Sequence, residues 1–349
     1  MNLKILIVVF ISMLFGCKSV ETITPINSIQ GVYIGGFDSV SKVSGKVWKN
    51  EDVLFSNESE RYSQILDIFI SGKDVFAVGY QYNGNIPYYA TLWKNGIPTI
   101  LGDKKLNSFA TSIFVSGNDV YVCGYQLAGN GFNSLVWKNG IPEIISPNCT
   151  LLSIFVSGLD VYTCGTTGNY PNKGLSIFKN SKEIYFEKGA YPTGMFVSGN
   201  DVFVSGYTGG LGNDPFSPSF YWGWGTQAKL WKNGLSTILN DVQTGFSRAN
   251  DVFVSGNDVY VVGDKYITQN GPSMALLWKN GVSTNLTTGN TITKASSVYV
   301  IGNDVYVCGY EINQGSVYSR NGKIWKNGVP SVVSKTNNNL YPTSIFVVK

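Results

Sequence analysis

The sequence contains no histidine, and only 14% of its 349 residues are charged. The absence of histidine excludes Ser-His and Cys-His catalysis and every histidine-ligated metal site. A net charge of +4 is too small for a nucleic-acid-binding surface, and no CxxC pair or ligand cluster occurs, so we expect no nucleic-acid partner, metal or cofactor. In contrast, 43% of the residues are hydrophobic and 40 are glycine, a composition that favours many short strands joined by tight turns.

The N-terminus has the pattern of an export signal. Lys4 precedes an apolar run of 11 residues, 5–15, which is shorter than the about 20 residues that span a bilayer. The next residues, Leu-Phe-Gly-Cys at 14–17, resemble the lipobox of bacterial lipoproteins, whose cysteine is lipidated after cleavage before it. The alternative is a conventional secretory signal with Cys17 merely nearby.

The lipobox resemblance implies two N-terminal segments and a location in the cell. Residues 1–16 would be the signal peptide, Cys17 the lipidated residue, and 17–30 the anchor and its polar tether. The acyl chains would hold the protein on a membrane surface without spanning it. Lys18 stands where some inner-membrane lipoproteins carry aspartate, so we expect export to the bacterial cell envelope, at the outer membrane or cell surface.

The segment 31–349 consists of one repeat present in seven copies. Trp-Lys-Asn recurs with a mean spacing of about 46 residues. Two further patterns, of the forms Val-Tyr-Val-x-Gly-Tyr and Ile-Phe-Val-Ser-Gly, also occur seven times. The Trp-Lys-Asn pattern begins at Trp48, Trp93, Trp137, Phe178 (in place of tryptophan), Trp231, Trp278 and Trp325.

Each repeat predicts four strands. In one copy we expect strands at 113–116, 120–125, 134–138 and 141–145, with an Asn-Gly pair suited to a type I′ hairpin between the last two. The first two strands are almost continuously apolar, so both of their faces must be covered. Four-stranded sheets stacked around an axis provide that cover. We therefore predict an all-β, seven-bladed β-propeller of antiparallel blades over 31–349.

The first and last repeats are incomplete in a complementary way. The body begins with three expected strands, at 32–37, 46–49 and 53–55, and ends with one, at 345–348. We expect that last strand to join the first three and close the ring. The Ile-Phe-Val-Ser-Gly strand is expected to be innermost; the alternative places the Trp-Lys-Asn strand there, as in WD-repeat rings.

The strand order resembles that of kelch-type blades. The repeats also resemble those of uncharacterised bacterial lipoproteins with Trp-Lys-Asn-Gly propellers. Neither resemblance implies a catalytic residue.

The loops separate into two rims. Both tight turns follow odd-numbered strands and nearly repeat from copy to copy, so we interpret that rim, including its recurring aspartates, as structural. The other loops vary in length and content, so their rim is expected to carry any binding site. The recurring aspartates are Asp74, Asp119, Asp160, Asp201, Asp258 and Asp304.

An aromatic insertion is the largest departure from the repeat. It spans 209–227, between the second and third strands of the fifth blade. Exposed aromatic rings flanked by glycine suit stacking on sugars or contact with a protein partner; the alternative is that the insertion folds over its own blade. The candidate ligand-binding residues are Phe216, Phe220, Tyr221, Trp222 and Trp224.

One pair of carboxylates is a candidate for enzyme chemistry. Asp67 and Asp251 stand just before the expected inner strand, near the channel mouth, where the other copies have serine or glycine. They belong to the second and sixth blades, nearly across the ring, whereas glycosidase pairs lie roughly 5–10 Å apart. We therefore expect a membrane-anchored, non-catalytic module that binds a protein or glycan. The alternatives are a polysaccharide-active propeller enzyme and a purely structural envelope protein.

Overall fold

A computed structural model describes most of the chain beyond residue 28. The described residues form 28 strands and no helix. They therefore contain no helix that could cross a membrane. Cys17 and all five candidate aromatic residues of the insertion lie outside the described residues. The described ranges are 29–40, 42–58, 60–84, 87–129, 131–169, 172–209, 226–239, 246–266, 271–312, 319–335 and 339–349.

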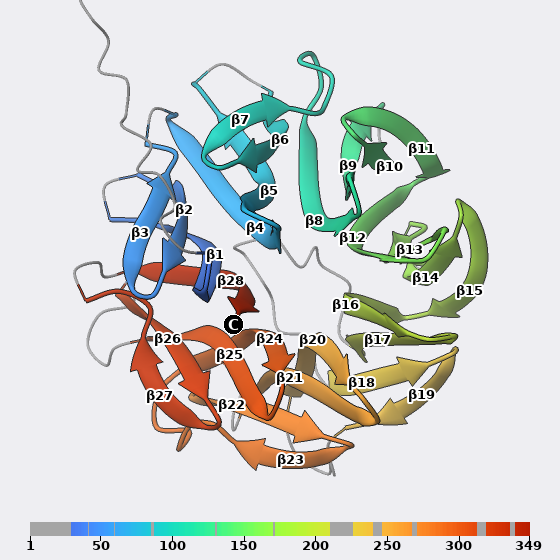
Figure 1. Cartoon of the computed structure of the whole chain (residues 1–349). Coiled ribbons are helices and arrows are strands. Elements are labelled where there is room, and N and C mark those ends of the chain that lie inside the picture. The colour runs from blue at the N-terminus through green and yellow to red at the C-terminus, as the bar shows by residue number, and fades with distance from the viewer. Residues whose placement is uncertain are drawn as a thin grey trace, which may run out of the picture.

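The strands form seven four-stranded antiparallel blades around a central axis, as predicted (Figure 1). Each list of strands below runs from blade 1 to blade 7. The innermost strands are β28 (Leu340–Val348), β4 (Tyr62–Ser71), β8 (Ser108–Ser116), β12 (Cys149–Ser157), β16 (Ala190–Ser198), β20 (Phe246–Ser255) and β24 (Thr293–Ile301). The second strands are β1 (Gly31–Asp38), β5 (Asp74–Tyr82), β9 (Asp119–Ala128), β13 (Asp160–Thr167), β17 (Asp201–Thr208), β21 (Asp258–Tyr266) and β25 (Asp304–Ile312).

The outer half of each blade is shorter. The third strands are β2 (Ser44–Lys49), β6 (Tyr89–Lys94), β10 (Gly131–Lys138), β14 (Gly174–Lys179), β18 (Gln227–Lys232), β22 (Ser273–Lys279) and β26 (Arg320–Lys326). The outermost strands are β3 (Asp52–Ser56), β7 (Ile97–Ile100), β11 (Ile141–Pro147), β15 (Lys182–Lys188), β19 (Leu235–Ile238), β23 (Val282–Asn285) and β27 (Val329–Val332).

The Ile-Phe-Val-Ser-Gly strand is innermost in every blade. These strands surround the axis in Figure 1, and each contacts the innermost strands of both neighbouring blades. The alternative frame, with the Trp-Lys-Asn strand innermost, is wrong. The innermost strands are also longer than predicted. In blade 3 the strand begins at Ser108 rather than Ile113, because residues 108–110 pair with the far end of β9.

The ring closes through the C-terminal strand, as predicted. β28 pairs with β1 in antiparallel register from Gly31 opposite Val348 to Asp38 opposite Leu340. Blade 1 therefore has the order β28-β1-β2-β3 and combines both ends of the described chain.

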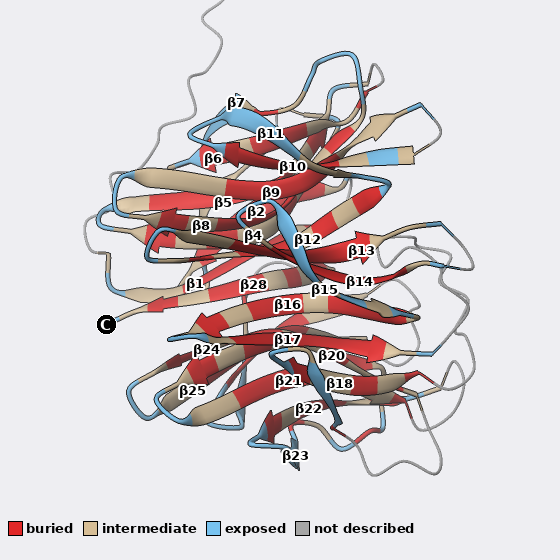
Figure 2. Cartoon of the chain, turned by 90° about the vertical axis from the view of Figure 1, so that its right-hand side faces the viewer, coloured by how far each residue is buried: buried red, intermediate tan, exposed pale blue. Residues whose placement is uncertain are grey.

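The two tight turns lie on one rim, which is also the rim where the C-terminus lies (Figure 2). Between β10 and β11, Asn139 and Gly140 have φ angles of 52° and 82°, which confirms the type I′ hairpin. Between β8 and β9 only Gly117 has a positive φ, of 59°, the pattern of a type II′ turn. The equivalent of Gly140 is Ser181 in blade 4, with a φ of 65°.

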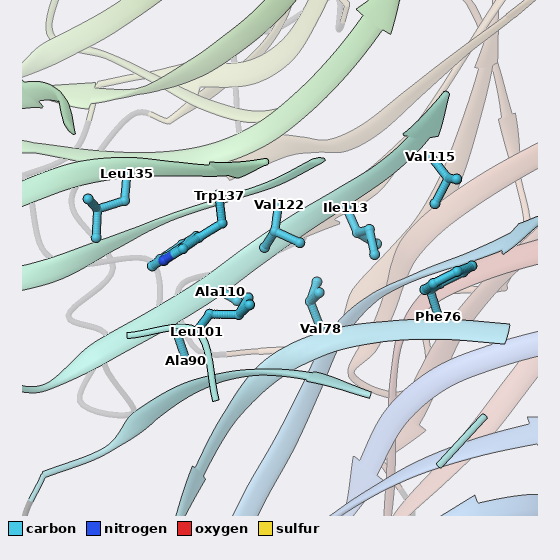
Figure 3. Close-up of a cluster of buried hydrophobic side chains, with 10 residues drawn as sticks. All are labelled: Phe76, Val78, Ala90, Leu101, Ala110, Ile113, Val115, Val122, Leu135 and Trp137. Carbon is cyan, nitrogen blue, oxygen red and sulfur yellow. The ribbon is translucent and has the colours of Figure 1, made fainter. Parts of the chain in front are cut away.

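The repeated tryptophans pack between blades. All six are at most 1% exposed. In Figure 3, Trp137 of blade 3 lies in a cluster with Val122 and Leu135 of its own blade and with Ala90 and Leu101 of blade 2. The interpretation of these tryptophans as blade packing is confirmed.

The recurring turn aspartates tie the second strand to the third. Asp119 Oδ2 lies 2.8 Å from Lys138 Nζ, and its Oδ1 accepts a hydrogen bond of 2.8 Å from Asn139 Nδ2. Asn139 Oδ1 in turn accepts from the backbone N–H of Val120. Lys138 and Asn139 together hold the pKa of Asp119 below its usual value. The same arrangement recurs in blades 2 to 7, so the structural interpretation is confirmed. In each blade the partners of the aspartate are the lysine that ends the third strand and the asparagine of the turn after it. The remaining five sets are Asp74, Lys94 and Asn95; Asp160, Lys179 and Asn180; Asp201, Lys232 and Asn233; Asp258, Lys279 and Asn280; and Asp304, Lys326 and Asn327.

A β-bulge interrupts every innermost strand at the same height. In β8 the register against β9 shifts between Ala110 and Ser112, so Thr111 is the extra residue. The facing residue of β9 is Gly124, where a Cβ would lie 2.0 Å from the carbonyl oxygen of Phe109. This close approach explains the constant glycine of the Val-Tyr-Val-x-Gly pattern.

Candidate functional site

The axial channel is lined by a closed ring of seven aromatic side chains, here called the collar. Each blade contributes one residue from its innermost strand. Neighbouring ring centroids are separated by 4.6–5.1 Å all the way round. The collar consists of Phe69, Phe114, Phe155, Phe196, Phe253, Tyr299 and Phe346.

A second ring, here called the polar ring, lies two residues before the collar in each innermost strand. It lines two cavities of the channel. One, of about 320 Å³, lies between the polar ring and the collar, and the other, of about 110 Å³, lies on the side of the variable rim. Its members are Asp67, Ser112, Ser153, Gly194, Asp251, Ser297 and Ser344. Asp67 and Asp251 therefore lie within β4 and β20 and not before them, which corrects the sequence prediction; the innermost strands simply extend further toward the variable rim.

Asp67 joins three blades. Its Oδ1 accepts hydrogen bonds from the Ser344 hydroxyl of blade 1, at 2.7 Å, and from the N–H of Ile68. Its Oδ2 accepts from the Ser112 hydroxyl of blade 3, at 2.8 Å, and from the N–H of Ile113. Burial raises the pKa of Asp67, and these four donors oppose the rise. Four donors occupy all the usual acceptor positions of a carboxylate.

Asp251 has one donor fewer. Its Oδ2 accepts from the Ser297 hydroxyl at 2.7 Å and from the N–H of Val298, but its Oδ1 accepts only from the N–H of Val252. On that side, blade 5 contributes Gly194 where Ser344 faces Asp67. Burial, with a smaller effect from the charge of Asp67, raises the pKa of Asp251 to about 6. Among the described residues, no donor occupies the fourth acceptor position of the Asp251 carboxylate.

Toward the variable rim, each innermost strand presents one side chain two residues before its bulged residue. We call these seven residues the mouth residues. They are structurally equivalent, because the carbonyl oxygen of each faces the constant glycine of the second strand. Their side chains nevertheless range from aromatic to cationic. They are Gln64, Phe109, Thr150, Tyr191, Arg248, Lys294 and Tyr341.

The mouth is aromatic at blades 2 and 3. Phe109 stacks on Tyr125 with centroids 5.0 Å apart, and its ring is 4.9 Å from that of Tyr80. Tyr62 and Tyr88 join the cluster at 5.9 Å from one another. All of these side chains except Tyr125 are partly exposed, so the cluster offers ring faces and phenol groups at the surface.

The mouth is cationic at blades 6 and 7. Arg248 and Lys294 are the mouth residues of these neighbouring blades, and Arg320 begins β26 of blade 7. The Arg248 guanidinium lies 4.9 Å from the Tyr207 ring, and that of Arg320 lies 4.5 Å from the Tyr341 ring. On this side of the rim, the two guanidinium groups therefore pack on aromatic rings of blades 5 and 1.

A further cavity, of about 760 Å³, lies between blades 3 and 4 on the tight-turn rim. It is lined by Asp119, Lys138 and Asn139, which already bind one another. Glu143 and Ser181, which also line it, are joined by a hydrogen bond of 2.7 Å. Because these polar groups are engaged with one another, we do not assign the cavity as the functional site.

The mouth residues were missed by the sequence analysis, which favoured the aromatic insertion. They do leave one signal in the sequence: they occupy a single repeat position that changes chemistry in nearly every copy, next to positions that stay apolar or carry a small hydroxyl side chain. The insertion residues stay a prediction, since they lie outside the described part of the chain.

Comparison with known proteins supports the fold alone. The β-propeller domain of the Trilobed protease from Pyrococcus furiosus is similar, with 11% sequence identity and a TM-score of 0.54 over 88% of this chain and 93% of that one. Two weaker likenesses are the polysaccharide lyase Uly1 (10% identity, TM-score 0.45, 78% and 82% covered) and a subtype N11 neuraminidase-like protein of A/flat-faced bat (13%, 0.43, 74% and 85%). No family model and no curated protein matches the chain.

Proposed function

We propose that this propeller is a non-catalytic binding module, held at the cell envelope by a lipid on Cys17, that presents its variable rim to a protein or glycan. The observation that carries this proposal is the diversity of the seven mouth residues on otherwise equivalent backbone. The backbone conformation and its pairing are the same at every copy of this position, so the fold does not require different side chains there. Side chains as different as Thr150 and Arg248 therefore support a role in recognition.

The polar ring supports binding over hydrolysis. A general acid or base needs an oxygen atom that can reach the substrate. Asp67 has its acceptor positions filled by donors from blades 1, 2 and 3, which favours a role in joining blades. Asp251, with its raised pKa and its free lone pair, is the group on which the alternative of a polysaccharide-active enzyme depends. Release of reducing ends from polysaccharides by the chain, lost in Asp251→Asn, would favour that alternative.

The binding proposal is tested with a substitution that the fold already tolerates. Thr150 occupies the mouth position in blade 4, so Phe109→Thr should fold. Leu159→Thr is the matched control, because Leu159 is 99% exposed on the opposite rim. After glycan-array and pull-down screens with the full-length chain, we expect Phe109→Thr to weaken capture of the ligand about tenfold or more and Leu159→Thr to leave it unchanged. Equal loss or equal retention in both variants would contradict the mouth as the binding site, and screens that find no ligand would favour the purely structural protein.

The aromatic insertion provides a separate test. If Trp222 and Trp224 bind the ligand, replacing both by alanine should change stability by under about 0.5 kcal/mol and reduce binding by about 2 kcal/mol or more. If they are core residues, each substitution should destabilise the fold by about 3–5 kcal/mol. Thermal melts separate the two outcomes before any ligand is known.

The anchor is tested by metabolic labelling. A palmitate analogue should label the wild-type chain in bacterial cells and fail to label Cys17→Ala. Equal labelling of both chains would contradict lipidation at Cys17.

A further inference from the structure

We propose that the axial channel contains a second binding site, separate from the mouth, for a small primary amine in its protonated form. In this site the ammonium group donates a hydrogen bond to Asp251 of the polar ring, and the apolar part of the molecule lies against the collar. The site is built at the boundary of blades 5 and 6, from Gly194 and Phe196 of β16 and from Asp251 and Phe253 of β20.

These four residues converge on one part of the channel. A Cβ on Gly194 would lie 2.8 Å from Asp251 Oδ1, so the carboxylate lies directly beside the position that has no side chain. Phe196 and Phe253 follow two residues later in the same strands, and their ring centroids are 4.8 Å apart. Asp251 and both rings line the same cavity of about 320 Å³, because side chains two residues apart point to the same face of a strand.

Asp251 supplies an acceptor that the fold leaves open. The equivalent serine on the other side of the ring, Ser344, donates a hydrogen bond of 2.7 Å to Asp67 Oδ1. Gly194 takes the place of that serine beside Asp251, and among the described residues the backbone N–H of Val252 is the only donor to Asp251 Oδ1. An N–H group of a ligand at the place of the missing hydroxyl completes the hydrogen bonds of the carboxylate.

The charge of the channel favours a cationic ligand. Among the described residues that line its two cavities, Asp67 and Asp251 are the only charged ones. A neutral hydroxyl at the open acceptor would leave both negative charges of the channel without a positive partner, whereas an ammonium group neutralises one of them. A charged donor also forms a stronger hydrogen bond to a carboxylate than a neutral donor does.

The collar selects the rest of the molecule. It lies two residues from the polar ring along each innermost strand, a rise of about 6.6 Å, which matches an alkyl chain of about five carbons. Six of the seven collar residues are phenylalanine, so an apolar body fits there, and aromatic ring faces also attract a cation. The lysine side chain of a partner docked on the variable rim would hold its stem on the rim side of the ammonium, away from the collar. We therefore assign the site to a free amine.

The test compares two ligands of one shape. At neutral pH n-pentylamine is cationic, as a lysine side chain is, and 1-pentanol is uncharged. Binding to the purified full-length chain in mild detergent is measured by calorimetry, with the detergent alone as the blank. We expect the amine to bind at least tenfold more tightly than the alcohol. Asp251→Ser, which introduces the residue that four other blades carry in the polar ring, should remove that difference. Equal affinity of the wild type for both ligands would overturn the proposal.

A matched pair of variants moves the open acceptor without removing either carboxylate. Gly194→Ser supplies the missing hydroxyl to Asp251 and should weaken amine binding at least tenfold. Ser344→Gly removes the hydroxyl from Asp67, so the double variant Gly194→Ser/Ser344→Gly should bind the amine again, now at Asp67. Amine binding by Gly194→Ser as tight as that of the wild type would show that the open acceptor is not the site. If Gly194→Ser fails to fold, Asp251→Ser still decides.

The channel site and the binding function of the mouth are tested separately. Leu159→Thr alters the opposite rim, far from the polar ring, and should bind the amine as the wild type does. A chain that captures a protein or glycan in the screens and binds neither pentylamine nor pentanol would overturn the channel site alone. A chain that binds pentylamine and captures no protein or glycan would overturn only the proposed function of the mouth.

Discussion

Gly194 and Asp251 face one another across the boundary between blades 5 and 6. The absence of a side chain at Gly194 determines both the position of the Asp251 carboxylate and its number of hydrogen bonds. A Cβ at Gly194 would lie 2.8 Å from Asp251 Oδ1, so a side chain there would displace the carboxylate. The serine that occupies this position in four other blades would also have supplied a donor to Oδ1, as Ser344 does for Asp67. The glycine therefore leaves Asp251 half-buried, ionisable and short of one hydrogen bond.

The raised pKa of Asp251 predicts a pH dependence of stability. Its folded-state pKa of about 6 exceeds the about 3.9 of an unfolded aspartate, so the native state binds the proton more tightly. This contribution is fully present below about pH 4 and is lost as pH rises through about 6, a change on the order of 2–3 kcal/mol. Denaturant melts between pH 4 and 7 should show this fall in the wild type and a flatter profile in Asp251→Ser.

The matched control is Asp103→Asn, which removes a charge from the loop between β7 and β8. Its profile should parallel that of the wild type. A wild-type profile with the same slope as Asp251→Ser would show that the carboxyl group is not perturbed in this way.

The bulge predicts that two glycines of one blade respond very differently to alanine. Gly124→Ala would place a Cβ 2.0 Å from a backbone oxygen, and backbone cannot yield as a flexible side chain does. We expect a loss of more than about 3 kcal/mol, or failure to fold. Gly117→Ala meets no atom within 4 Å and suffers only its φ of 59°, so its loss should be about 1 kcal/mol. Thermal melts showing equal losses would contradict the bulge geometry.

The I′ turns predict a stabilising substitution. Ser181 adopts a φ of 65° at a position that is glycine in five of the seven copies. Ser181→Gly should stabilise the fold by about 1 kcal/mol, because a left-handed conformation costs a non-glycine residue about 1–2 kcal/mol, offset in part by the lost hydrogen bond to Glu143. The reciprocal Gly140→Ser should destabilise blade 3 by a similar amount. A destabilised Ser181→Gly variant would mean that the bond to Glu143 outweighs backbone strain.

The repeat made the ring of blades predictable, since three recurring patterns specify strand, turn and order at once. It could not specify the mouth. The residues that meet there, such as Phe109 and Tyr125, come from the ends of two strands, and their pairing depends on a bulge that no local pattern announces. The innermost strands were predicted five or six residues too short for the same reason: residues like Arg248 and Lys294 lack the apolar character by which a buried strand is recognised. Asp67 and Asp251 were found in the sequence as departures from serine, but the role of Asp67 in joining blades required the contacts of Ser112 and Ser344.

Ring closure predicts that the last five residues are indispensable. Ile345 and Val347 are each 3% exposed, and Phe346 completes the collar between Tyr299 and Phe69. Deleting 345–349 removes these buried side chains, each worth about 1.5–3 kcal/mol, from a fold whose whole stability is about 5–15 kcal/mol. It also exposes the edge of β1. The truncated chain should aggregate or melt far below the wild type. Deleting Lys349 alone removes an exposed ion pair with Asp304 and an exposed hydrogen bond to the Ile301 carbonyl oxygen, and should leave the melting temperature nearly unchanged. A melting temperature of the five-residue deletion within a degree or two of the wild type would exclude closure through β28.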